Sequence, residues 1–150
     1  MERALRLVAG CDAAIRHGFD WVGHVPEPDE IRLPMPQRFA SREHYGATLL
    51  HALVCWTGHP RRLHRAFGGR WGDAAFAIEA LVAELGTVLL QEHCGLVGAA
   101  VEGRASSLAV WLALLRHDRS AIFTAMRAAG QAVDFILARE VPALPPCGGP

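Results

Sequence analysis

The sequence has no lysine and no asparagine, and all fifteen of its basic residues are arginines. The absence of lysine excludes a lysine nucleophile, a Schiff base and a phosphate-binding loop of the lysine-containing kind. Fifteen acidic residues balance the arginines. The chain therefore lacks the basic excess of a nonspecific nucleic-acid binder and the acidic excess of a disordered tail.

Long hydrophobic runs are also missing, because no apolar stretch approaches the ~20 residues that span a bilayer. The first residues are charged and do not form the apolar segment of a signal peptide. There are only four cysteines, none of them in a C-x-x-C pair, which is not the pattern of a disulfide framework. We expect no membrane association and a location in the reducing cytoplasm.

A length of 150 residues suits one domain. The pattern of short alternating segments followed by longer helical periods predicts an α+β fold with a small N-terminal β-sheet and about four helices. We expect a single domain over residues 1–141 and a flexible Pro/Gly tail over 142–150. Sheet segments are expected at 14–17, 19–22 and 30–33, after a short helix at 3–10.

The helices after the sheet are marked by capping residues and by apolar residues at helical spacing. Ser41 is the expected N-cap of a helix over 41–57, and Asp73 that of a helix ending near residue 94. A third helix is expected to end at 116–117, and Asp118 is the expected cap of a fourth.

The most informative stretch surrounds His51. His51 and Cys55 are four residues apart, so on a helix they project from one face. In zincins, two histidines at this spacing bind zinc, and a glutamate directly after the first histidine is the general base. Here Ala52 stands at the base position and Cys55 at the position of the second histidine.

This stretch resembles the zincin-like metallopeptidase domain of the ArdC antirestriction family, which also occurs in polyvalent proteins of mobile elements. The family pattern reads roughly Y-x-A-T-L-L-H-E-L-x-H-W-T-G-H-x-x-R-L-x-R, and further stretches resemble D-x-I-x-x-P, E-E-L-V-A-E-L-G and S-W-L-x-x-L-x-x-D-x-x-A-I-F-x-A. The resemblance covers roughly residues 10–140. Its matches include Asp29, Ile31, Pro34, Tyr45, Ala47, Thr48, Leu49, Leu50, His51, Leu53, Trp56, Thr57, Gly58, His59, Arg62, Leu63, Arg65, Glu79, Leu81, Val82, Ala83, Glu84, Leu85, Gly86, Trp111, Leu112, Leu115, Asp118, Ala121, Ile122, Phe123 and Ala125.

The resemblance implies a zincin-like fold and a metal site, for which His51, Cys55, Glu79 and Glu84 are the candidate ligands. One carboxylate position of the family stretch is Ala80, and the residues do not decide which glutamate faces the site. Cysteine can bind zinc, but its sulfur lies closer to the backbone than a histidine nitrogen does. We therefore expect zinc to be bound weakly or not at all.

Each candidate also has a simpler interpretation. His51 can be a hydrogen-bonded helix histidine, and Cys55 a small buried thiol. His59 can pack or hydrogen-bond at the helix end, and Trp56 can belong to the core rather than to a binding surface. The arginines of the 61–70 loop can contact a phosphate or a partner carboxylate, or be solvated.

The missing base favours a metallopeptidase-like domain of the antirestriction type that is catalytically inactive and acts as a binding or structural module. The alternative is a zinc-dependent hydrolase using His51, Cys55 and a glutamate of the 79–84 segment, and a third hypothesis keeps zinc as a structural element only. A protein or peptide is the expected partner. The resemblance implies nucleic-acid contact only through a separate domain, for which this chain has no room.

Overall fold

The computed structural model describes residues 1–67 and 74–145. In these ranges the chain forms a small sheet and five α-helices, as the sequence predicted for an α+β fold. The elements are α1 (Glu2–Cys11), β1 (Ala14–His17), β2 (Gly23–Val25), β3 (Glu30–Leu33), the 3-10 turn η1 (Pro36–Arg38), α2 (Arg42–Trp56), α4 (Ala75–Cys94), α5 (Arg104–His117) and α6 (Ala121–Leu137).

The sheet has the strand order β1-β3-β2, with β1 parallel and β2 antiparallel to the central β3. Ile31 and Leu33 of β3 are fully buried, and they attach the sheet to the helical core. Among the described residues, β2 pairs with β3 alone and is an edge strand of the sheet. Two of its residues, Gly23 and His24, line the cleft described below.

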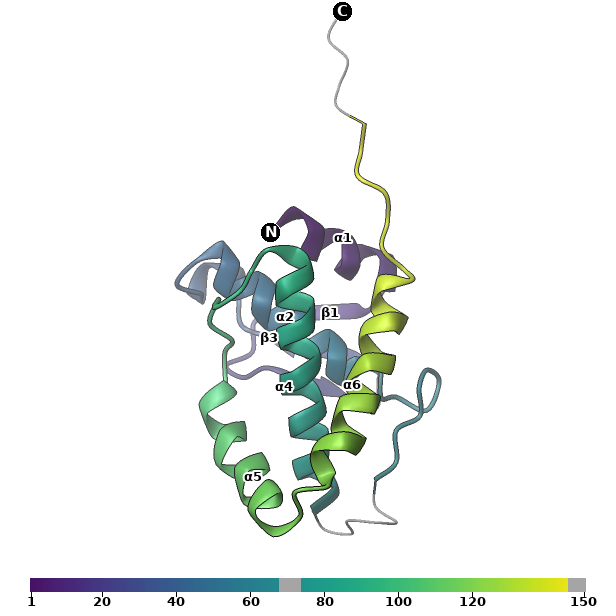
Figure 1. The fold of residues 1–150 in the computed structure, drawn as a ribbon. Coiled ribbons are helices and arrows are strands. Elements are labelled where there is room, and N and C mark those ends of the chain that lie inside the picture. The colour runs from purple at the N-terminus through teal and green to yellow at the C-terminus, as the bar shows by residue number, and fades with distance from the viewer. Residues whose placement is uncertain (68–73, 146–150) are drawn as a thin grey trace, which may run out of the picture.

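Helices α2 and α4 form the centre of the molecule. Residues 46–50 and 52–54 of α2 are buried, and α4 packs against α2, α5 and α6. In Figure 1, α5 and α6 flank α4 on its two sides, and α1 crosses the end of the molecule from which the C-terminal segment extends. Gly86 permits the close approach of α4 to α2, because a Cβ there would lie 2.9 Å from Cγ1 of Val54.

Two local predictions were wrong. The second strand occupies Gly23–Val25 rather than 19–22, because the backbone N–H of Phe19 bonds to Leu33 and the rings of Phe19 and Trp21 make an edge contact in a bend. Asp118 follows the end of α5 and accepts hydrogen bonds from the N–H and hydroxyl of Ser120, and Ser120 rather than Asp118 is the N-cap of α6.

Ser41 is the N-cap of α2, as predicted, with its hydroxyl accepting from the N–H of His44. The predicted cap Asp73 lies outside the described residues. The expected domain limits, 1–141 and a tail over 142–150, stay a prediction. In the described ranges, no helix combines the length and the apolar character needed to cross a lipid bilayer.

Candidate functional site

A cleft of about 610 Å³ opens between the two central helices and the edge of the sheet. His51, Ala52 and Cys55 of α2 and Ala80 and Ala83 of α4 line it. The remaining lining residues come from the segment before and into β2, from the start of α4 and from the start of α5: Asp20, Trp21, Val22, Gly23, His24, Phe76, Glu79, Glu102, Gly103, Ser106 and Ser107. The i,i+4 spacing therefore does place His51 and Cys55 on one face, toward α4.

The hydrogen bonds of His51 fix which ring nitrogen carries the proton. Nδ1 of His51 lies 3.0 Å from the hydroxyl oxygen of Thr87. The hydroxyl proton of Thr87 is donated to the carbonyl of Ala83, so His51 Nδ1 is the donor to Thr87. Burial lowers the pKa of His51, and the neutral ring then carries its lone pair on Nε2.

Ala52 and Cys55, which the resemblance aligns with the base and the second metal ligand, cannot act as a base or as a ready thiolate at neutral pH. Ala52 is fully buried along the helix and offers no proton acceptor. Burial, with the nearby charge of Glu79, raises the pKa of Cys55 to about 11. The thiol is therefore protonated at neutral pH, whereas metal binding and nucleophilic attack both require the thiolate.

Both candidate carboxylates are bound to arginines of the same chain. Oε1 of Glu79 lies 2.8 Å from Nε of Arg65, whose side chain is only 5% exposed. Oε1 of Glu84 lies 2.6 Å from Nη2 of Arg104. Of the two glutamates, Glu79 lines the cleft and Glu84 does not.

These ion pairs reduce the number of side chains that are available to bind a metal ion. Among residues 1–67 and 74–145, no three histidine, cysteine, aspartate or glutamate side chains are grouped so that they could hold an ion. A tetrahedral site needs about four ligands. Here the candidates are one imidazole, that of His51, one protonated thiol, that of Cys55, and carboxylates that are neutralised by arginines. The donor set as arranged does not fit a tetrahedral metal ion, and ligand roles for His51, Cys55, Glu79 and Glu84 remain predictions.

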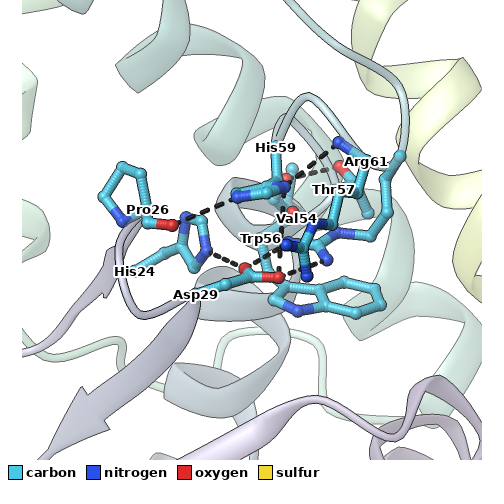
Figure 2. A network of polar contacts seen from close by, with 9 residues as sticks. His24, Pro26, Asp29, Val54, Trp56, Thr57, His59 and Arg61 are labelled. Carbon is cyan, nitrogen blue, oxygen red and sulfur yellow. Dashed lines mark hydrogen bonds and ion pairs between the residues drawn. The ribbon is translucent and has the colours of Figure 1, made fainter.

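A second polar network clamps the β2–β3 turn to the end of α2 (Figure 2). Asp29 accepts two hydrogen bonds from Arg62, at 2.6 and 2.9 Å, and one from Nε2 of His24 at 2.7 Å. These contacts, with that of Arg62 foremost, hold the pKa of Asp29 well below its usual range. Burial lowers the pKa of His24, which is therefore neutral with its proton on Nε2.

His59 and Trp56 belong to this network rather than to the cleft. Nε2 of His59 bonds to the carbonyl of Pro26, and its Nδ1 accepts from the backbone N–H of Arg61. The guanidinium carbon of Arg62 lies 3.8 Å from the centre of the Trp56 ring. The simpler interpretation of both residues, packing and hydrogen bonding at the helix end, agrees with these contacts.

Sequence reasoning left several of these residues without a role. Asp29, Arg62 and Arg65 matched the family pattern, but their pairing partners lie 33 and 14 positions away in sequence and carry no local signal. Thr87 and Arg104 stood outside the matched runs. The arginines of the 61–65 segment include two that bind carboxylates of this chain, Arg62 and Arg65.

The helix that carries His51 packs against the helix that carries Glu79 and Glu84, beside a small sheet, which is the α+β arrangement expected of a zincin-like domain. The sequence matches the zincin-like metallopeptidase family over residues 2–128, and the chain belongs to that family. The fold also matches the crystal structure of the antirestriction protein ArdC from plasmid R388 with Mn(II) bound. That match has a TM-score of 0.79 and 30% sequence identity, and it covers 93% of this chain and 52% of that chain. The metal-free ArdC structure matches with the same TM-score and identity, over 91% of this chain and 50% of that one.

Longer proteins contain similar sequences. A DNA primase TraC of Escherichia coli is 38% identical over 141 residues, which are 93% of this chain and 13% of that protein. The protein y4eC of Sinorhizobium fredii (strain NBRC 101917 / NGR234) is 36% identical over 143 residues, which are 93% of this chain and 46% of that protein. The chain thus spans less than half of either relative. Together, the family match and the ArdC structures confirm the predicted ArdC resemblance and the zincin-like fold.

Proposed function

We propose that this domain is a metallopeptidase-like module of the antirestriction type that has lost peptidase activity and binds a protein or peptide in the cleft. The observation that carries this proposal is Ala52 at the base position of the cleft-lining helix. A positioned general base contributes typically ~10²–10⁴-fold to the rate, and alanine contributes none of it. On the same wall, Cys55 and Ala80 stand where the resemblance places a second histidine and a carboxylate.

The cleft retains the features of a binding site. Its volume of about 610 Å³ lies within the range of ligand pockets, roughly 300–1,000 Å³. Gly23 and His24 of the edge strand lie along it, and Trp21 and Phe76 present exposed rings, 42% and 64% accessible. An extended peptide that pairs with a free strand edge gains backbone hydrogen bonds, which supports a peptide as the occupant.

The alternative function, a zinc-dependent hydrolase using His51, Cys55 and one glutamate, requires Glu79 or Glu84 to leave its arginine. Breaking such a pair leaves a guanidinium without its carboxylate, at a cost that metal binding has to offset. Zinc as a purely structural element meets the same obstacle. The ArdC structure with Mn(II) supports metal binding in a relative, and zinc in this chain remains part of the alternative.

The relatives suggest a setting. ArdC comes from a plasmid and TraC is a DNA primase, which supports a role for this module beside DNA-handling proteins of mobile elements. With fifteen arginines against fifteen acidic residues, we assign nucleic-acid contact to a separate domain rather than to this one. The proposed location is the cytoplasm.

The test is a proteolysis assay paired with metal analysis. The protein, purified without chelator, is incubated with casein in Zn²⁺ or Mn²⁺, and its metal content is measured in parallel. We expect no chelator-sensitive cleavage and less than one equivalent of bound metal. Robust cleavage that EDTA abolishes would establish the hydrolase alternative, and stoichiometric zinc without cleavage would establish the structural role.

A further inference from the structure

The polar groups that line the cleft are mostly hydrogen-bond acceptors, and two of them are imidazole nitrogens. His51 uses its N–H on Thr87, so its other nitrogen, Nε2, is an acceptor with no hydrogen-bond partner among the described residues. His24 uses its N–H on Asp29, whose ionised carboxylate can only accept. Its Nδ1 is likewise an acceptor without a partner in the described part of the chain.

The carboxylates of the cleft add to this set. Asp20, Glu79 and Glu102 line it, and among the described lining residues none is an arginine. Asp20 is exposed and has no ion pair with a described residue. Glu102 is 51% exposed, with Nε2 of His44 at 3.3 Å as its ion-pair contact. Both carboxylate oxygens of Glu79 accept hydrogen bonds from Arg65, so Asp20 and Glu102 carry the charge of the cleft that is not paired with an arginine in the described residues.

The serine hydroxyls at the start of α5 do not change the excess of hydrogen-bond acceptors in the lining. Ser106 donates its hydroxyl proton to the carbonyl of Gly103, so it too offers an acceptor. Ser107 is the one lining hydroxyl with no hydrogen bond to a described residue. The polar lining therefore consists mostly of groups that need a donor.

Because the proposed occupant is an extended peptide, this lining specifies its side chain. We infer that the cleft selects a peptide carrying an arginine, whose guanidinium donates to His51, Asp20 and Glu102, flanked by apolar residues that contact Trp21 and Phe76. This inference rests on the proposed binding function. A guanidinium has five N–H donors and no acceptor, and it matches carboxylates in a planar fork. An acidic side chain would face carboxylates of its own sign and lone pairs it cannot satisfy.

The experiment measures fluorescence anisotropy of labelled heptapeptides Gly-Thr-Val-Xaa-Val-Thr-Gly, with Arg, Gln or Glu at the central position. The whole chain is titrated at pH 7.5 in EDTA, which removes adventitious metal. We expect the Arg peptide to bind about tenfold more tightly than the Gln peptide and the Glu peptide to bind most weakly, since charge-assisted hydrogen bonds are the stronger ones.

The variant Asp20→Asn/Glu102→Gln should lower the affinity for the Arg peptide about fivefold while leaving the Gln peptide unchanged, because the lost interactions involve charge alone. Glu92→Gln, on the exposed side of α4, is the matched control and should change neither. Equal binding of all three peptides would overturn the arginine selection and leave the binding function standing. Binding of none of them would remove the proposed peptide-binding function together with this inference. Tighter binding of the Glu peptide would overturn the inference, because it would show that donors at the start of α5, and not the carboxylates, determine which side chain binds.

Discussion

Arg65 and Glu79 form an ion pair beside the cleft, with Nε and Oε1 2.8 Å apart, and the arginine also donates to Val54 and Thr57. The side chain of Arg65 is 5% exposed and that of Glu79 is 35% exposed. One arginine thus binds acceptors at the C-terminal end of α2 and pairs with Glu79, one of the two candidate carboxylate ligands.

Arg65→Ala should destabilise the fold by about 3 kcal/mol, because it leaves the Glu79 carboxylate without its cation and the Thr57 hydroxyl without its donor, although the Val54 carbonyl keeps its bond from Thr57. Chemical denaturation measures this change in the free energy of unfolding. Arg61→Ala is the matched control: its side chain is exposed, and a change within about 0.5 kcal/mol is expected there. Equal effects of the two variants would contradict a structural role for Arg65.

The contact between α2 and α4 supplies a second prediction. A methyl group added at Gly86 would meet Cγ1 of Val54 at 2.9 Å, and Val54 is a fully buried, branched side chain in the core. Gly86→Ala should therefore cost roughly 1–3 kcal/mol of stability by overpacking. Gly130→Ala, in α6, meets nothing within 4 Å and should instead stabilise by about 0.5–1 kcal/mol. Thermal unfolding of both variants tests the sign of each change.

Much of this architecture could be predicted from local sequence. Ser41 marked the start of α2 because a capping hydroxyl is a short-range interaction between residues three apart. The facing of His51 and Cys55 followed from helical spacing alone. The second strand was misplaced because its position depends on pairing with β3, for which Phe19 to Trp21 gave an equally good alternating pattern.

The chemistry of the site was less accessible from the sequence. The candidate ligands Glu79 and Glu84 were identifiable by the resemblance, but their pairing with Arg65 and Arg104 depends on contacts 14 and 20 positions apart. The proton position on His51 requires Thr87 and Ala83, neither of which has a sequence signature. Long-range pairing of polar groups carries no periodicity, so it appears only in the folded structure.

Acid should weaken the clamp on the β2–β3 turn. The folded-state pKa of Asp29 is lowered, so its stabilisation is fully present above its unfolded pKa of about 3.9 and is lost as pH falls below that value. Asp29→Asn should cost about 2 kcal/mol at pH 7 and flatten the dependence of stability on pH below about 4. Urea denaturation between pH 2.5 and 7 measures both, with exposed Glu27→Gln as the control.

His24 acts in a different pH window. Its pKa is lowered by burial, so the unfolded chain binds the proton more readily and stability declines as pH falls below about 6.5. His24→Gln should remove part of this decline between pH 6.5 and 5. An unchanged slope in that window would show that His24 keeps its proton affinity on folding, contrary to its burial against Asp29.

The last prediction concerns restoration of the metal. Three small residues on the cleft wall, Ala52, Cys55 and Ala80, stand where a base, a second imidazole and a further carboxylate could project. The variant Ala52→Glu/Cys55→His should raise zinc affinity over the parent protein, because a neutral imidazole replaces a thiol whose pKa is about 11. Adding Ala80→Glu supplies a carboxylate free of Arg65, and zinc affinity should rise by about a further tenfold or more. Isothermal titration with Zn²⁺ measures the series, and His51→Ala in the triple variant should abolish the gain. In the parent protein, weak zinc binding should disappear with Cys55→Ala, and tight binding that survived both Cys55→Ala and His51→Ala would place the metal outside this cleft.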